Sequence, residues 1–238
     1  MSPLPEEDVE VVVVGGGFCG VALAAALRHF GVKFVLLEAG AGAGAGFGGH
    51  YDRLRLHTPH HRLPHDGDLE TTGGYGLYKT KAELVRYLND YCELHALTSS
   101  ELRYSAPVAS VAKERGRNGW PTGWAVTTEQ GKIYHAKAVA ICTGAARVPH
   151  IPAFADPQAS AGALDLLSRP GAEIVHSRHY RNGARFENRH VAVIGSGNSA
   201  AEICVDLVEH GASKVTLVVN GKCLKNDDLP LKNDGFYT

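Results

Sequence analysis

Two glycine-rich turns, each placed between a valine-rich segment and an apolar helical pattern, constrain the fold of this chain more than any other feature. The first turn reads GGGFCG over residues 15–20 and follows a predicted strand over residues 9–14. The second turn reads GSGNSA over residues 195–200 and follows a predicted strand over residues 191–194. A strand that enters a helix through such a turn is typical of a parallel sheet covered by helices, so we predict an α/β fold.

The first turn fits the G-x-G-x-x-G fingerprint of a dinucleotide-binding unit. Gly15 permits the tight turn, Gly17 lets a pyrophosphate approach the backbone, and Gly20 lets the helix pack closely on the strand. The next predicted strand, over residues 33–37, ends at Glu38, about 20 residues beyond the turn, where a carboxylate can accept the ribose hydroxyls. The order of strand, turn, helix, strand and acid therefore predicts that this unit binds a dinucleotide.

The second turn has Ala200 at the last position of the fingerprint, an exchange that the pattern allows. Ser199 and Glu202 have the spacing of a capping box for a helix that runs to about His210, and Gly211 is a typical stop signal. Taken alone, this turn could also serve only to pack a helix on a sheet. Two such turns in one chain favour one flavin and one nicotinamide dinucleotide. The candidate binding residues here are Gly195, Gly197, Asn198, Ser199 and Ala200.

Composition and charge exclude several other classes of protein. The chain has 238 residues, 44% of them hydrophobic, which is enough for a packed core. Its formal net charge of −1 gives no electrostatic reason to expect binding to nucleic acid or to an anionic membrane. The longest apolar run, over residues 21–27, is too short to span a bilayer, and the acidic residues 6–8 do not resemble a signal peptide. We therefore expect a cytoplasmic protein.

The cysteines and histidines predict neither a disulfide framework nor a metal site. The five cysteines are odd in number and widely separated, and without two neighbouring thiols the chain does not resemble a dithiol reductase, a class built on similar folds. Four histidines crowd together, but Pro59 and Pro64 interrupt their spacing and no cysteine accompanies them. These histidines are His57, His60, His61 and His65.

The residues between the two turns predict a loop, a helix and a set of strands. The alanine and glycine run over residues 39–49 is typical of a flexible loop, and Thr80 with Glu83 forms a capping box for a helix to about Leu97. Short strands over residues 107–135 lead into an apolar strand over residues 138–142.

That last strand ends in Thr143 and Gly144, which bring a small side chain and free backbone groups close to a bound cofactor. Prolines then stiffen the exit, so we place the domain boundary after residue 148.

Five segments together resemble the flavin-containing monooxygenases, and in particular the YUCCA-type branch that acts on indole-3-pyruvate in plants. The resemblance covers most of residues 8–219. It implies two Rossmann-like units, the first binding FAD and the second binding NADPH. The segments are, in order, the first turn with Glu38, YDRLRLHTP at residues 51–59, CTG at residues 142–144 with Pro149 and Pro152 after it, HSRHY at residues 176–180, and GSGNSAAEI at residues 195–203.

The resemblance implies a monooxygenase in which NADPH reduces FAD and the reduced flavin uses O₂ to insert oxygen into a small organic substrate. Oxidative decarboxylation of indole-3-pyruvate or a similar 2-oxo acid is the specific case. His57 lies in a segment that lines the flavin in YUCCA-type enzymes, so it is the candidate catalytic residue; a structural histidine bonded to backbone fits the position as well. Arg53 is a candidate for the flavin phosphates or else part of a solvated face. The sequence predicts no oligomeric state.

The chain departs from the family at its carboxyl end. Asn220 stands where relatives commonly have an arginine for the ribose 2′-phosphate, so the feature that best separates NADPH from NADH is lost and NADH is a second candidate. Relatives also continue well beyond Val219, whereas here a polar tail without helical or strand period follows.

We therefore expect the second unit to be incomplete. The predicted domains are an FAD-binding domain over residues 1–148, itself incomplete without a C-terminal return, a partial NAD(P)H-binding domain over residues 149–219, and an irregular tail over residues 220–238. A truncated, non-catalytic dinucleotide-binding remnant is the alternative function. A small but complete relative is the other interpretation of the short carboxyl end.

Overall fold

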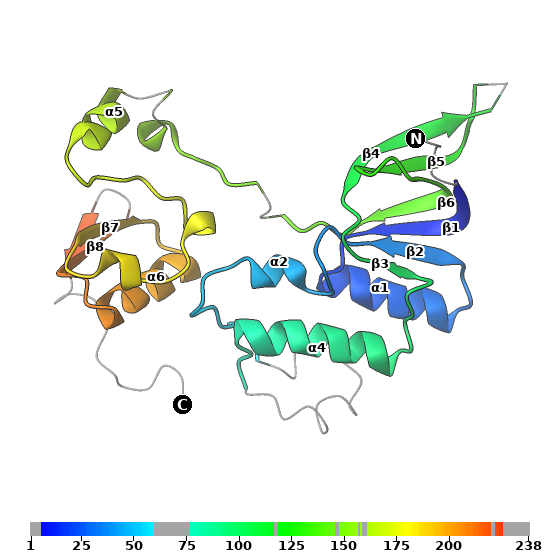
Figure 1. The fold of residues 1–238 in the computed structure, drawn as a ribbon, viewed down its shortest axis with the longest axis horizontal. Helices are drawn as coiled ribbons and strands as arrows, with labels where there is room; N and C mark the ends of the chain where they lie inside the picture. Colours follow the sequence, from blue (N-terminus) through cyan, green and yellow to red (C-terminus); the bar gives the residue numbers. More distant parts are fainter. Residues whose placement is uncertain are drawn as a thin grey trace. The chain divides into compact units, whose positions relative to one another are not determined.

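The computed structural model describes residues 6–59, 77–116, 119–145, 148–156, 158, 161–219 and 222–225. It divides the chain into two compact units, whose elements are shown in Figure 1. The first unit comprises Met1–Gly49 and Arg55–Val148, and the second comprises His50–Leu54 and Pro149–Thr238.

The first unit is built on a six-stranded sheet in the order β3-β2-β1-β6-β5-β4 (Figure 1). Strands β3, β2, β1 and β6 are parallel, and β5 and β4 continue the sheet with antiparallel pairing. The predicted α/β fold is confirmed. The elements are β1 (Glu7–Val14), α1 (Phe18–His29), β2 (Phe34–Leu37), α2 (Ala45–Gly48), α4 (Lys81–Leu94), β3 (Leu102–Arg103), β4 (Val108–Arg115), β5 (Pro121–Thr128) and β6 (Ile133–Ile141).

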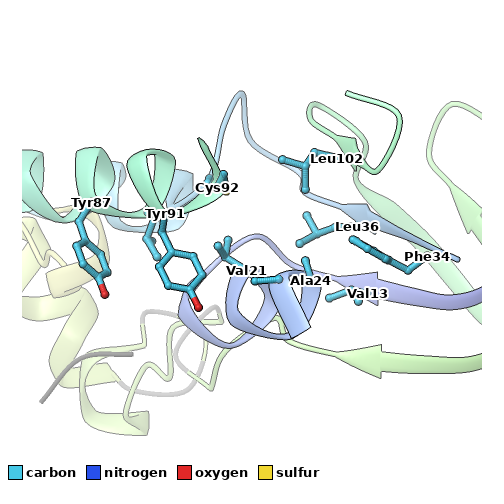
Figure 2. Close-up of a cluster of buried hydrophobic side chains, with 12 residues drawn as sticks. Val13, Val21, Ala24, Phe34, Leu36, Tyr87, Tyr91, Cys92 and Leu102 are labelled. Carbon is cyan, nitrogen blue, oxygen red and sulfur yellow. The ribbon is translucent and has the colours of Figure 1, made fainter. Parts of the chain in front are cut away.

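Strand β1 is buried on both faces because its valines alternate between two apolar clusters. Val13 packs with residues of α1 and α4, and Figure 2 shows Tyr87 and Tyr91 of α4 in this cluster. Val12 belongs to the second cluster, which includes Val126 of β5. Both valines are fully buried, and each burial contributes roughly 1.5–3 kcal/mol to folding. This core fixes the strand from which the first glycine turn starts.

Helix α4 begins with the predicted capping box. The Thr80 hydroxyl accepts a hydrogen bond from the Glu83 N–H (3.3 Å), and the Thr80 N–H donates to the Glu83 carboxylate (2.8 Å). The helix ends at Leu94, three residues before the predicted end at Leu97. Leu84 and Tyr91 face the core as the helical period predicted.

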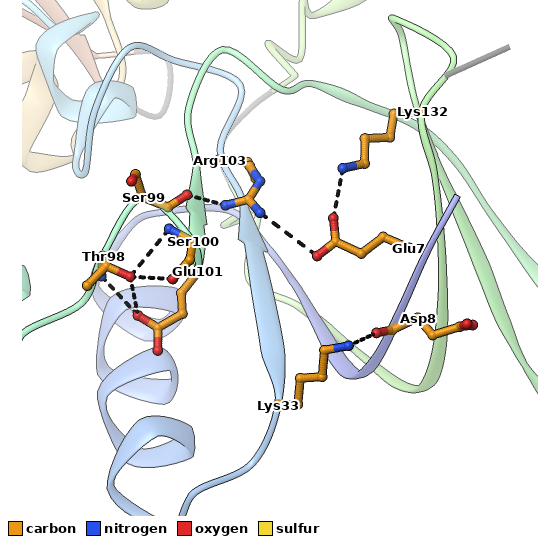
Figure 3. Close-up of polar contacts among 9 residues, drawn as sticks. All are labelled: Glu7, Asp8, Lys33, Thr98, Ser99, Ser100, Glu101, Arg103 and Lys132. Atoms are coloured by element: carbon orange, nitrogen blue, oxygen red, sulfur yellow. Dashed lines mark hydrogen bonds and ion pairs between the residues drawn. The ribbon is translucent and has the colours of Figure 1, made fainter. Parts of the chain in front are cut away.

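Charged side chains tie several elements of the first unit together (Figure 3). Lys132 Nζ lies 2.7 Å from Glu7, and Arg103 lies 3.9 Å from the other oxygen of the same carboxylate. The Glu101 carboxylate accepts the Thr98 N–H (2.9 Å) in the turn before β3. Such exposed pairs contribute little energy one by one, about 0–1 kcal/mol each. Together they join β1, β3 and the β5–β6 turn.

His135 of β6 lies between two carboxylates. Its Nδ1 lies 2.7 Å from Glu114 of β4, and its Nε2 lies 3.2 Å from Glu6. The hydrogen bond to Glu114, more than the weaker contact to Glu6, raises the pKa of the imidazole. The charged histidine therefore stabilises this end of the sheet.

Residues 39–49 are more ordered than the sequence predicted. They contain the short helix α2, and Ala43 is only 1% exposed. The Gly44 N–H donates to the Gly16 carbonyl (2.8 Å), and a Cβ on Gly44 would lie 2.8 Å from Leu88. The prediction of a flexible loop is wrong because small residues let this segment pack against α4, which composition alone does not reveal.

The second unit has a three-stranded sheet in the order β7-β8-β9, in which β7 and β8 are parallel and β9 is antiparallel to β8. Strand β9 lies within residues 220–238, where an irregular tail was predicted, so that prediction is wrong for its four residues, which are too few to show a strand period. No helix in the described ranges is long and apolar enough to cross a membrane. The elements are η2 (Ala153–Ala155), α5 (Ala161–Ser168), η3 (Ser177–His179), η4 (Ala184–Phe186), β7 (His190–Ile194), α6 (Asn198–Glu209), β8 (Lys214–Val219) and β9 (Lys222–Lys225).

Candidate dinucleotide-binding turns

The first glycine turn joins β1 to α1, and each of its three fingerprint glycines meets a different constraint. Gly15 has φ +107°, and a Cβ there would lie 2.5 Å from the carbonyl oxygen of Cys142. A Cβ on Gly20 would lie 1.8 Å from the carbonyl oxygen of Gly15, so only glycine lets α1 pack this closely. A Cβ on Gly17 would meet no atom within 4 Å. Gly15 and Gly20 therefore shape the turn, and Gly17 borders open space.

The turn lies at the carboxyl ends of three parallel strands, where ligands bind in open α/β sheets. The Gly15 N–H donates to the Leu37 carbonyl at the end of β2 (2.8 Å), and the Cys142 N–H donates to the last residue of β1 (2.8 Å). Thr143 follows directly, and its nitrogen lies 3.2 Å from the position of a Cβ on Gly15. Gly144 has φ +75° and borders open space. The structure therefore brings Thr143 and Gly144 to the first turn.

Glu38 follows β2 and reaches the same turn from the side. Its Oε2 accepts a hydrogen bond from the Gly16 N–H (2.6 Å), and its Oε1 accepts one from the Gly40 N–H (2.7 Å). These two bonds fix the carboxylate, and each oxygen keeps a further lone pair that can accept a hydroxyl. The carboxylate is thus held at the first turn, and its role toward a ribose stays a prediction from the fingerprint.

The amino end of α1 is suited to an anion. Its N-cap is Gly17, which has no side chain to cap the helix, so the first backbone N–H groups can turn to a ligand. The partial positive charge of a helix amino end favours a diphosphate there. The Phe18 ring packs against Phe47 (5.4 Å between centroids) and Tyr87 (6.3 Å), which holds this end of the helix in place.

The second glycine turn joins β7 to α6 with a similar geometry. Gly195 has φ +135°, and its N–H donates to the Val218 carbonyl (3.0 Å). A Cβ on Gly197 would meet no atom within 4 Å, as at the first turn. The Ala200 Cβ lies 3.9 Å from the position of a Cβ on Gly195, so this turn has room for the methyl group that the first turn excludes.

The predicted capping box of Ser199 and Glu202 is wrong. Gly197 is the N-cap of α6, no side chain caps it, and Asn198 is the first helical residue. The glycine turn starts the helix two residues before the position that the pattern suggested, so Ser199 lies within the first helical turn. Its exposed hydroxyl lies 3.5 Å from the Tyr51 hydroxyl, a contact that the sequence did not reveal.

Other predicted site residues have different surroundings. Arg53 forms an ion pair with Glu209 of α6, and both residues belong to the second unit. The flavin role of Arg53 stays a prediction. His57 is exposed, and both of its predicted roles stay predictions. Asn220, His60, His61 and His65 lie outside the described residues. In the part of the chain that the structure describes, no group of three or more His, Cys, Asp or Glu side chains could hold a metal ion.

Two cysteines that are far apart in the sequence both lie at the first turn. Cys19 is exposed in the first turn of α1, and Cys142 follows β6; the two are not bonded to each other. Burial raises the pKa of the Cys142 thiol, and a charge on Cys19 raises it further. The wide separation of the cysteines in the sequence therefore did not show which thiols are neighbours in the fold. The argument from that separation against a dithiol reductase is accordingly weaker. Cys92 and Cys204 are buried, and burial raises the pKa of each to about 11.

The chain matches known families and proteins over most of its length. Residues 12–233 match the sequence model of the family described as pyridine nucleotide-disulphide oxidoreductase. The chain is 33% identical over 216 residues to indole-3-pyruvate monooxygenase YUCCA8 of Oryza sativa subsp. indica, covering 88% of this chain and 48% of the relative. It is 31% identical over 212 residues to probable indole-3-pyruvate monooxygenase YUCCA1 of Arabidopsis thaliana, covering 88% and 47%. The chain thus spans about half the length of the curated relatives it matches.

Solved structures show the same fold. A flavin-containing monooxygenase from Stenotrophomonas maltophilia superposes with a TM-score of 0.71 at 27% identity, covering 89% of this chain and 58% of that protein. Cyclohexanone monooxygenase from Rhodococcus sp. Phi1 bound to NADP⁺ superposes with a TM-score of 0.67, covering 94% of this chain and 42% of that protein. At 22% identity, this second likeness shows the fold alone.

Proposed function

Because the chain belongs to the pyridine nucleotide-disulphide oxidoreductase family, we propose that it is a flavin-dependent monooxygenase unit that holds FAD at its first glycine turn and a nicotinamide dinucleotide at its second. The resemblance to YUCCA-like flavin monooxygenases that the sequence predicted is confirmed by the relatives described above.

The open space at both turns is the observation that carries the proposal. Gly17 and Gly197 are the N-caps of α1 and α6, and at both positions a Cβ would meet no atom within 4 Å. Two pyrophosphates placed in the gaps would accept hydrogen bonds from the amino ends of the two helices.

The remaining residues would orient the cofactors. Glu38, fixed by two backbone N–H groups, would accept the ribose hydroxyls of FAD. Thr143 and Gly144 would let backbone approach the flavin nucleotide at the strand ends. FAD, when bound, supplies electron transfer from the nicotinamide and the reaction with O₂. The protein's part is to bind, position and shield the reacting groups.

The first candidate substrate is a small organic molecule of the 2-oxo acid class, with indole-3-pyruvate as the specific case. The YUCCA relatives are named as indole-3-pyruvate monooxygenases, which supports this choice. NADPH is the first candidate reductant because the family motif is present, and NADH is the second because Asn220 replaces the expected arginine. A cytoplasmic location stays a prediction from the sequence.

The test uses the purified full chain. FAD bound per chain is measured from the visible spectrum, and anaerobic addition of NADPH should bleach it. Admission of O₂ with indole-3-pyruvate should then restore the oxidised spectrum and yield the acid that is one carbon shorter, detected by mass spectrometry. Retention of FAD without NADPH oxidation would favour the non-catalytic dinucleotide-binding alternative. No binding of either dinucleotide would reject both functions.

A further inference from the structure

A five-residue segment links the second glycine turn to a distant part of the sequence. Residues 50–54, which we call the strap, belong to the second unit, although the chain on either side of them belongs to the first. The Asp52 N–H donates to the Arg181 carbonyl (2.8 Å), and the Asn182 amide donates to the Asp52 carboxylate (2.9 Å). Tyr51 is only 4% exposed. The strap is therefore an integral part of the second unit.

Tyr51 aims its hydroxyl at the second turn. The hydroxyl donates to Ser199 Oγ over 3.5 Å, which is long for a hydrogen bond between hydroxyls. Its ring meets Tyr180 edge-on, with 6.5 Å between centroids. Ser199 is exposed in the first turn of α6, beside the backbone N–H groups that follow Gly197.

A second tyrosine contacts the same helix further along. The Tyr180 hydroxyl donates to the buried carboxylate of Asp206 (2.5 Å). Burial, and then the bond to Asp206, raises the pKa of Tyr180, so the hydroxyl keeps its proton and can donate. Asp206 follows Ser199 by seven residues, about two helical turns, so the two lie on one face of α6. Tyr180 thus holds the helix, and Tyr51 contacts its ligand-facing end.

The direction of the hydrogen bond has a chemical consequence. A serine hydroxyl has one proton to donate and lone pairs that accept. When Ser199 Oγ accepts from Tyr51, its own proton is free to point to another acceptor, and donation by the tyrosine strengthens that second bond. The nearest strong acceptor in a loaded turn would be a phosphate oxygen at the amino end of α6.

We propose that Tyr51 is a positioning residue for the nicotinamide dinucleotide, acting through the Ser199 hydroxyl on a pyrophosphate oxygen. The inference rests on the proposed function, because it needs a dinucleotide at the second turn. Tyr51 lies outside the glycine fingerprint and is the donor in its hydrogen bond with Ser199.

The experiment compares Tyr51→Phe, Ser199→Ala and the double variant. Tyr51→Phe keeps the ring that packs on Tyr180, and Asn182→Ala is the matched control because it removes a strap hydrogen bond that does not involve Ser199. The dissociation constant for NADPH is measured by titration, together with FAD content, thermal unfolding and the limiting rate of flavin reduction at saturating NADPH.

Each single variant should weaken NADPH binding about three- to tenfold, as expected for loss of one hydrogen bond. The double variant should bind no more weakly than Ser199→Ala, since Tyr51 acts through Ser199. FAD content, unfolding temperature and the limiting reduction rate should not change, and Asn182→Ala should bind NADPH like the wild type.

Two results would overturn the inference alone, namely wild-type affinity in Tyr51→Phe, or additive losses in the double variant. A loss in Tyr51→Phe that accompanies a lower unfolding temperature would assign the residue to packing and also overturn it. A wild type that retains FAD but binds no NADPH would reject this inference together with the nicotinamide part of the proposed function.

Discussion

Replacing Gly20 by alanine should destabilise the first unit strongly, although the change adds one methyl group. The new Cβ would lie 1.8 Å from the Gly15 carbonyl oxygen and 3.4 Å from the Cys142 Cβ. Because non-bonded heavy atoms rest about 3.5 Å apart, α1 would have to move by roughly 1.7 Å from the turn. The obstacle is the backbone of Gly15 and not a flexible side-chain tip, whereas the distance to Cys142 is an ordinary contact.

We expect this variant to lose about 3 kcal/mol of unfolding free energy, the upper part of the usual range of about 1–3 kcal/mol for overpacking. For a chain of this size, that corresponds to a fall of roughly 6–12 °C in the unfolding temperature. FAD retention should fall with it, because the displaced helix no longer offers its N–H groups at the turn.

The matched variant is Gly17→Ala, three residues away on the same turn. Its Cβ would meet no protein atom within 4 Å. Alanine is a poorer N-cap than glycine but also restricts the unfolded chain, so the net change in stability should stay within about 1 kcal/mol. A methyl group in the gap should nevertheless displace the pyrophosphate and weaken FAD binding about 10- to 100-fold, the effect of losing one charge-assisted hydrogen bond.

Thermal and urea unfolding of the flavin-free proteins, followed by circular dichroism, would measure the stabilities, and fluorescence titration would measure FAD binding. Equal stability of the two variants would refute the close approach of α1 to Gly15. Wild-type FAD affinity in Gly17→Ala would show that the open space is not where the pyrophosphate binds.

Three further outcomes are expected. The hydrogen bond to Glu114 raises the pKa of His135, so the charged histidine stabilises the fold fully below about pH 6.5, and this stabilisation is lost as pH rises through the folded-state pKa. The unfolding free energy from urea curves should fall by under about 1 kcal/mol over this range in the wild type, and His135→Gln should not show this fall. Thr80→Ala should lower unfolding free energy by about 1 kcal/mol, measured in the same way, because it removes the capping box. Burial raises the pKa of Cys92 and Cys204 to about 11, so neither thiol should react with a disulfide reagent at pH 8 until the chain unfolds; rapid labelling of either in the native protein would contradict their burial.

The parts of the fold that the sequence predicted are those that depend on neighbouring residues. Strand, turn and helix at Gly15–Gly20 follow from local backbone requirements, and the geometry at Gly20 shows how strict they are. The capping box of Thr80 and Glu83 formed because its partners are three residues apart. The same pattern failed at Ser199 because the preceding glycine turn had already set the start of the helix.

What the sequence could not predict depends on contacts between distant segments. Ala43 lies in an alanine and glycine run that is typical of a loop, and only its packing beside α4 makes it part of the core. Cys19 and Cys142 are separated by most of the first unit, yet the closing of β6 onto β1 brings both to one turn. Tyr51 begins a segment that resembles the family, but its place beside Ser199 follows from a chain path that no local pattern encodes.

Because of the strap, the second unit is formed from two separate stretches of the sequence, which matters for chimeras between relatives. A chimera joined at residue 148 takes Tyr51 from one parent and α6 from the other, so a hydroxyl and the serine it faces are inherited separately. Such hybrids should fail more often than their overall identity suggests, and restoring the parental residues 50–54 should recover them. A fragment that begins at Pro149 needs the same five residues supplied in front of it, through a linker, to cover the ring of Tyr180.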